Sequence, residues 1–100
     1  MDALAFQEVV EELRQNGYIS DYEARIIFDR RRDIARDLVR CNLGMLFNDF
    51  YLLSNVVGNI IRELNSRGKE SYATRLRASF DELIDDIVAV LKNTCGCREK

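Results

Sequence analysis

The stretch that decides the fold is residues 43–64, LGMLFNDFYLLSNVVGNIIREL, which has the pattern of a single helix. Of its 22 positions, 13 are apolar or aromatic. At about 100° per residue these positions form a main stripe of Leu46, Phe50, Leu53, Val57, Ile60, Ile61 and Leu64. A second stripe adjoins it and contains Phe47, Tyr51, Ser54 and Gly58. A helix this apolar must be buried from several directions, so we predict that it is the hub of a bundle completed by homodimerisation.

Three further amphipathic segments surround this central helix in the sequence. We expect helices over residues 2–16, 20–42 and 71–93, with Gly17 and Gly68 as stop signals. Ser20 and Glu23 have the spacing of a capping box. The join at residues 42–44 leaves open whether the second and third helices are continuous. The pattern predicts an all-α, antiparallel bundle of about four helices, with a single domain over residues 1–94 and a flexible tail over 95–100.

The composition argues against catalysis and against a strongly charged partner. The chain has 100 residues, 47% of them hydrophobic and 32% charged, with a net charge of −2. It contains no histidine, which removes the commonest general base and metal ligand. It also lacks a glycine-rich phosphate loop and a span of apolar residues long enough for a membrane helix. We therefore expect a protein that is not an enzyme, needs no cofactor and does not enter a membrane.

An arginine stripe is the most prominent polar feature. Arg25, Arg32, Arg36 and Arg40 align on one face of the second helix, where they could bind the phosphates of duplex RNA or DNA. Asp29 and Asp33 lie within or beside the same stripe and repel a polyanion. The favoured interpretation is a solvated, salt-bridged face; nucleic-acid binding and an acidic protein partner are the alternatives.

Arg31 breaks the apolar face of the second helix. A charge at this position is unfavourable unless it is paired, and Asp49 on the central helix is the best candidate partner. We predict a buried ion pair between Arg31 and Asp49. Two alternatives remain: Arg31 reaches solvent along its aliphatic stem, or it meets the carboxylate of another protein.

Metal and disulfide chemistry is not expected from the cysteines or from the acidic residues. Cys41, Cys95 and Cys97 are odd in number, which is typical of reduced thiols in a cytoplasmic protein, and their spacing does not suit structural zinc. The acidic run Asp81, Glu82, Asp85 and Asp86 lies opposite the apolar face of its helix and is interpreted as a solvated surface.

The second stripe of the central helix is the predicted interface. The small residues Ser54 and Gly58 let another helix approach, and Phe47 and Tyr51 are candidate anchors for a dimer or partner. In size and composition the chain resembles the small helical adaptors and inhibitors of viruses and mobile elements. We therefore expect a cytoplasmic protein–protein interaction module that acts as a regulator, inhibitor or adaptor. A dimer that binds nucleic acid through the arginine stripe is the alternative.

Overall fold

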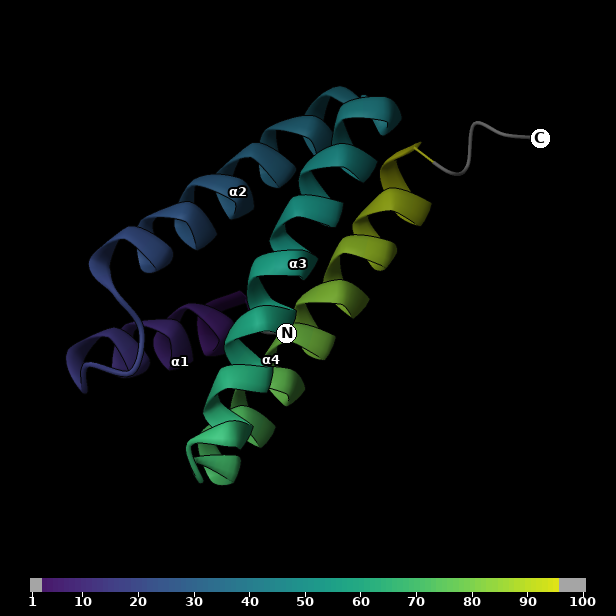
Figure 1. Ribbon diagram of the computed structural model, residues 1–100. Helices are drawn as coiled ribbons and strands as arrows, with labels where there is room; N and C mark the ends of the chain where they lie inside the picture. Colours follow the sequence, from purple (N-terminus) through teal and green to yellow (C-terminus); the bar gives the residue numbers. More distant parts are fainter. Residues whose placement is uncertain (1–2, 96–100) are drawn as a thin grey trace.

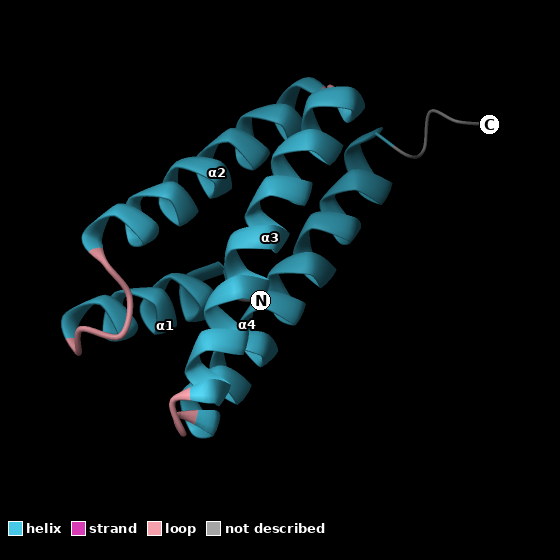
Figure 2. Cartoon of the chain, in the orientation of Figure 1, coloured by secondary structure: helices cyan, strands magenta, loops and turns pink. Residues whose placement is uncertain are grey.

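Helices make up the part of the chain that the structure describes. The computed structural model describes residues 3–95, and they contain no strand (Figure 2). The elements are α1 (Ala3–Gln15), α2 (Asp21–Arg40), α3 (Leu43–Ser66), α4 (Glu70–Val90) and a π-helical turn, η1 (Leu91–Cys95). The predicted all-α class is confirmed. Residues 96–100 of the expected tail lie outside the described residues, whereas Cys95 belongs to η1.

The helix boundaries follow the capping signals in the sequence. The Ser20 side chain accepts a hydrogen bond from the backbone N–H of Glu23 at 3.0 Å, and the Glu23 carboxylate accepts one from the Ser20 N–H at 2.9 Å. This reciprocal pair is the capping box that starts α2. Gly17 and Gly68 follow α1 and α3 with φ values of 78° and 75°, a left-handed conformation that glycine adopts without a steric penalty.

Helices α2 and α3 are separate. Cys41 ends α2 with φ 52° and ψ 38°, a left-handed conformation that is uncommon outside glycine. Asn42 then starts α3, because its side chain accepts a hydrogen bond from the Met45 N–H at 3.3 Å. The chain thus reverses at residues 41–42, and Gly44 lies inside the first turn of α3 rather than at a helix stop.

Helix α3 lies in the middle of the molecule, with α2 and α4 packed on either side of it (Figure 1). The shorter α1 packs against α4 and touches α2 at the opposite end of the molecule from the α2–α3 turn (Figure 1). The molecule is elongated, with extents of 47 × 21 × 19 Å. Because α1 covers only part of this length, the described residues at the end that contains the α2–α3 turn belong to α2, α3, α4 and η1.

Phe80 joins three helices in the core. Its ring lies 5.6 Å from that of Phe6 on α1 and 6.0 Å from that of Phe50 on α3, centroid to centroid. Arg75 and Glu12 add an ion pair between α4 and α1, with Nη2 and Oε1 2.7 Å apart. The main stripe of α3 contributes five buried residues to the same core: Leu46, Leu53, Val57, Ile60 and Leu64. The main stripe of α3 is therefore buried mainly between α2 and α4, whereas α1 packs mainly against α4 rather than against α3.

Candidate functional site

An exposed apolar patch lies where the first half of α3 runs beside the last half of α4. Leu43, Phe47 and Tyr51 recur every four residues on α3 and so share one side of that helix. On α4, Val88 lies next to Phe47, with which it lines one cavity. Phe47 and Tyr51 are each 63% exposed, and Leu43 and Val88 are each 43% exposed. We call these four residues the α3–α4 patch.

A groove between the two helices continues the patch inward. It contains a cavity of about 130 Å³ that only apolar side chains line: Leu46, Phe47, Phe50, Ile84, Ile87, Val88 and Leu91. This volume is several times the roughly 30 Å³ that one water occupies, so the cavity can admit an apolar side chain of a partner.

The α3 side of the patch is free of exposed charge. Between Leu43 and Ile61 the only charged residue is Asp49, which is 1% exposed and faces α2. Helix α3 therefore runs for about five turns without an exposed charged side chain. The exposed face of a helix in a monomer usually carries charges, whereas the centre of a protein interface is depleted of them.

The groove extends along α3 to the other two residues of the predicted interface. Ser54 and Gly58 line a second hollow, together with Arg77 and Asp81 of α4. A Cβ atom added to Gly58 would meet nothing within 4 Å, so none of the helices in the described part of the chain uses the small residue for a close approach. Phe47 thus lines the first cavity, and Ser54 and Gly58 line the second hollow, with Ile84 common to both. Tyr51 lines neither, but it is exposed on the same side of α3 as Phe47. The sequence did not single out Leu43 and Val88, although Leu43 stands one turn before Phe47.

A cluster of charged residues lies on the opposite side of α3, against α2. Asp37 and Asp49 are 2% and 1% exposed. Nη1 of Arg30 donates to Asp49 Oδ1 at 3.0 Å and to Asp33 Oδ2 at 3.1 Å. Arg36 lies 3.3 Å from Asp33, 3.3 Å from Asp37 and 3.8 Å from Asp49. We call these five residues the α2–α3 ion cluster.

The predicted partner of Asp49 is wrong, although its burial was anticipated. Asp49 pairs with Arg30 and Arg36, and no ion pair joins it to Arg31 within residues 3–95. Helical periodicity gave the face of α2 but not the direction of each long side chain. The signal available in the sequence was the spacing of Arg30 and Asp33, which suits an (i, i+3) pair beside the central helix.

The closeness of the two buried aspartates affects the pKa of Asp49. Burial raises the pKa of Asp49, and the adjacent carboxyl group of Asp37 raises it further by hydrogen bonding and by charge repulsion. Oδ2 of Asp37 and Oδ2 of Asp49 are both buried without a hydrogen-bond donor. A proton on Asp49 lets that carboxyl group donate to Asp37, which satisfies both oxygens.

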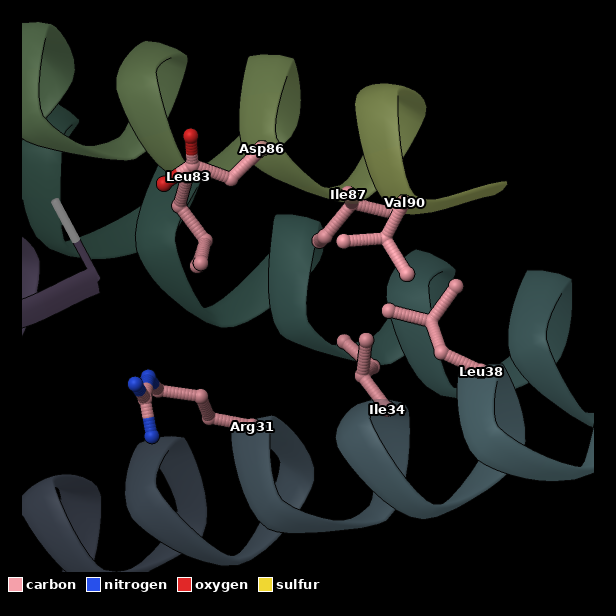
Figure 3. A pocket seen from close by; sticks show the side chains of 7 residues that line it. All are labelled: Arg31, Ile34, Leu38, Leu83, Asp86, Ile87 and Val90. Carbon is pink, nitrogen blue, oxygen red and sulfur yellow. The ribbon is translucent and has the colours of Figure 1, made fainter. Parts of the chain in front are cut away.

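Arg31 lies in a second apolar pocket, between α2 and α4. It shares this cavity of about 110 Å³ with Ile34, Leu38, Leu83, Asp86, Ile87 and Val90. Figure 3 shows its side chain along α2 at one end of the pocket, with Asp86 across the pocket on α4. The Nε atom of Arg31 is buried without a hydrogen-bond partner. Among residues 3–95, Arg31 therefore carries an unsatisfied donor and does not form the predicted buried ion pair with Asp49.

Neighbouring carboxylates neutralise half of the arginine stripe. Arg32 binds Asp29, with Nη2 and Oδ1 2.8 Å apart, and Arg36 belongs to the α2–α3 ion cluster. Arg25 and Arg40 are exposed at opposite ends of α2. These pairs agree with the salt-bridged surface favoured from the sequence, and they leave the stripe a poor match for a phosphate backbone.

The expectation of reduced thiols is wrong for two of the three cysteines. A disulfide joins Cys41, at the end of α2, to Cys95, at the end of η1. Cys97 lies outside the described residues. Structural disulfides are typical of oxidising compartments, so this bond does not support the cytoplasmic location expected from the sequence. No spacing rule in the sequence could have paired residues 54 positions apart.

Comparisons with known proteins do not add a family. No protein-family model, curated protein or solved structure matches the chain. Within residues 3–95, no group of three or more metal-binding side chains converges on one point. Over the same residues, no helix has the length and apolar character needed to cross a bilayer. The candidate site is therefore defined by its own geometry, and the α3–α4 patch is its strongest feature.

Proposed function

We propose that the protein is a non-enzymatic helical interaction module that pairs with a second copy of itself through the α3–α4 patch. It then presents its remaining helix faces to a protein partner, as a small regulator, inhibitor or adaptor does. The observation that carries the proposal is the exposure of Phe47 and Tyr51 on a stretch of α3 that has no exposed charge.

The area of the patch suits a dimer. An aromatic side chain that is 63% exposed presents about 100–150 Å² of surface. The four rings of two copies would contribute about 500 Å² of the roughly 1,600 Å² that a standard interface buries. Leu43, Val88 and the groove behind them supply further apolar contact, and the neighbouring Arg77 and Asp81 suit a polar rim.

Other occupants fit the patch less well. A membrane surface that carries anionic lipids attracts basic residues around an apolar face, and the patch has none between Leu43 and Ile61. Nucleic acid requires free cations, whereas Arg32 and Arg36 are paired with carboxylates. A second copy of the chain presents a matching apolar, uncharged surface.

The proposal is tested by the mass of the protein in solution. Sedimentation equilibrium of the wild type should report dimers, and Phe47→Glu/Tyr51→Glu should sediment as a monomer because it places two charges in the interface. The matched control is Tyr22→Glu/Val39→Glu. These two side chains of α2 are 72% and 81% exposed, so their replacement should leave the dimer intact.

Two results would overturn the proposal. A wild type that stays monomeric at high concentration would show that the patch does not bind a second copy. Wild-type protein that binds duplex RNA tightly, with an affinity that falls steeply as salt rises, would instead support the nucleic-acid alternative. Circular dichroism of each variant confirms that the helices are retained.

A further inference from the structure

The disulfide ties the end of the chain's last helical segment to the turn between α2 and α3. Cys41 is the first residue of that turn and stands two residues before Leu43 of the α3–α4 patch. Cys95 ends η1, which continues α4 without a break. The cross-link therefore fixes the last turn of the α4 segment beside the first turn of α3, where the groove begins.

Burial of apolar side chains contributes little to holding this turn in place. None of the five residues of η1 is buried, and only Leu91 packs against the core, as a partly buried side chain. Segments with few buried contacts open at low free energy. The covalent bond between Cys41 and Cys95 is thus the strongest tether of residues 91–95.

The tethered turn forms one wall of the groove. Leu91 lines the apolar cavity together with Val88, and Leu46 and Phe47 of α3 form the facing wall. If residues 91–95 detach, Leu91 leaves the cavity and Val88 loses its neighbour. The shape that a partner contacts therefore depends on the state of the disulfide.

We infer that the Cys41–Cys95 disulfide is a redox latch that keeps the α3–α4 patch in its binding conformation until a dithiol reductant opens it. The inference rests on the proposed function, because it names the regulation of the same surface. Latched protein pairs with its second copy, and reduced protein pairs weakly.

Opening the latch is an ordinary thiol–disulfide exchange. A thiolate of the dithiol attacks Cys95 Sγ, the bond between Cys95 and Cys41 breaks, and Cys41 leaves as a thiolate that takes up a proton. The second thiolate of the reductant then attacks the mixed disulfide and releases Cys95 as a thiolate. The protein disulfide gains two electrons, and the reductant becomes a cyclic disulfide. Both cysteines are only partly buried, so the bond is within reach of a small thiol.

The test uses the full chain carrying Cys97→Ser, so that only the latch can respond to the reductant. Hydrogen exchange of the backbone amides in residues 88–95, followed by mass spectrometry, should accelerate when dithiothreitol is added. Sedimentation equilibrium should show a weaker dimer. If the reduced turn is detached nine-tenths of the time, only one pair of copies in about a hundred has both turns attached, so the apparent dimer affinity falls about a hundredfold. The control is Cys41→Ser/Cys97→Ser, which should exchange and dimerise like the reduced protein with or without dithiothreitol.

The two measurements separate failure of the latch from failure of the proposed function. Oxidised protein that dimerises with an affinity unchanged by dithiothreitol would overturn the latch and leave the dimer standing. If residues 88–95 exchange faster on reduction but the oxidised protein forms no dimer, the disulfide does hold the turn closed. That result would nevertheless overturn both the regulation of dimerisation by the latch and the proposed function. Unchanged exchange on reduction would overturn the latch regardless of oligomeric state.

Discussion

Replacing Asp49 with asparagine should stabilise the protein at neutral pH, although it removes a buried charge that two arginines contact. Asp49 lies 3.0 Å from Arg30, and its Oδ2 atom and that of Asp37 are both buried without a donor. An asparagine can keep the acceptor for Arg30 and donate its amide N–H to Asp37. Arg30 stays paired through Asp33.

The size of the effect follows from the hydrogen bonds gained and weakened. Relief of two unsatisfied buried acceptors at about 1.5 kcal/mol each, less about 1 kcal/mol for a weaker bond from Arg30, gives a gain of about 2 kcal/mol. The gain should depend on pH. The pKa of Asp49 is raised in the folded state, so the folded wild type holds a proton on Asp49 more tightly than the unfolded chain does. This proton stabilises the wild type fully below the unfolded pKa of about 3.9. The stabilisation is lost as pH rises through the folded pKa.

The assay is urea denaturation followed by circular dichroism from acidic to neutral pH, without reductant so that the disulfide stays intact. Asp49→Asn should match the wild type most closely at acidic pH and exceed it in free energy of unfolding at neutral pH. Asp29→Asn is the matched control, since Asp29 on α2 is also paired with an arginine but its side chain is 46% exposed, and it should change little. An Asp49→Asn variant that is less stable than the wild type at neutral pH, or whose advantage is the same at every pH, would refute the raised pKa of Asp49 as the cause.

Two further changes test the packing of the fold. Phe80→Ala should lower the free energy of unfolding by about 3–5 kcal/mol, because the Phe80 ring contacts rings on both α1 and α3. A loss below about 1 kcal/mol in urea denaturation would contradict that role. Arg31→Met should be neutral or stabilising by up to about 2 kcal/mol, because it removes a buried unsatisfied donor and keeps an apolar side chain in the pocket. A clear loss of stability in the same assay would show that the guanidinium group has an essential partner.

Much of the fold could be predicted from the sequence because its signals are local. The capping box at Ser20 and Glu23, the stop at Gly68 and the main stripe of α3 depend on residues within a few turns of one another. Local signals do not give the packing of α1, whose apolar face fits several neighbours equally well. Local signals also did not decide whether the second and third helices are continuous. The left-handed residue at this junction is Cys41, whereas glycine is the residue that adopts this conformation most readily, so Gly44 was the candidate stop.

The candidate site was predicted only in part, for the same physical reason. Phe47 and Tyr51 were identified because a helix with two apolar stripes cannot bury both against two neighbours. Val88 was missed because its position depends on how α4 lies against α3. The Arg30–Asp49 pair and the Cys41–Cys95 bond are contacts between segments distant in sequence, and only the three-dimensional arrangement brings them together.

The most direct test of the central claim is the mass of the oxidised protein in solution. Sedimentation equilibrium over micromolar concentrations should give about twice the 11.6 kDa chain mass for the wild type and for Tyr22→Glu/Val39→Glu, and the chain mass for Phe47→Glu/Tyr51→Glu. A wild type that sediments at 11.6 kDa throughout, or a Phe47→Glu/Tyr51→Glu variant that dimerises as well as the wild type, would contradict the claim that the α3–α4 patch binds a second copy of the chain.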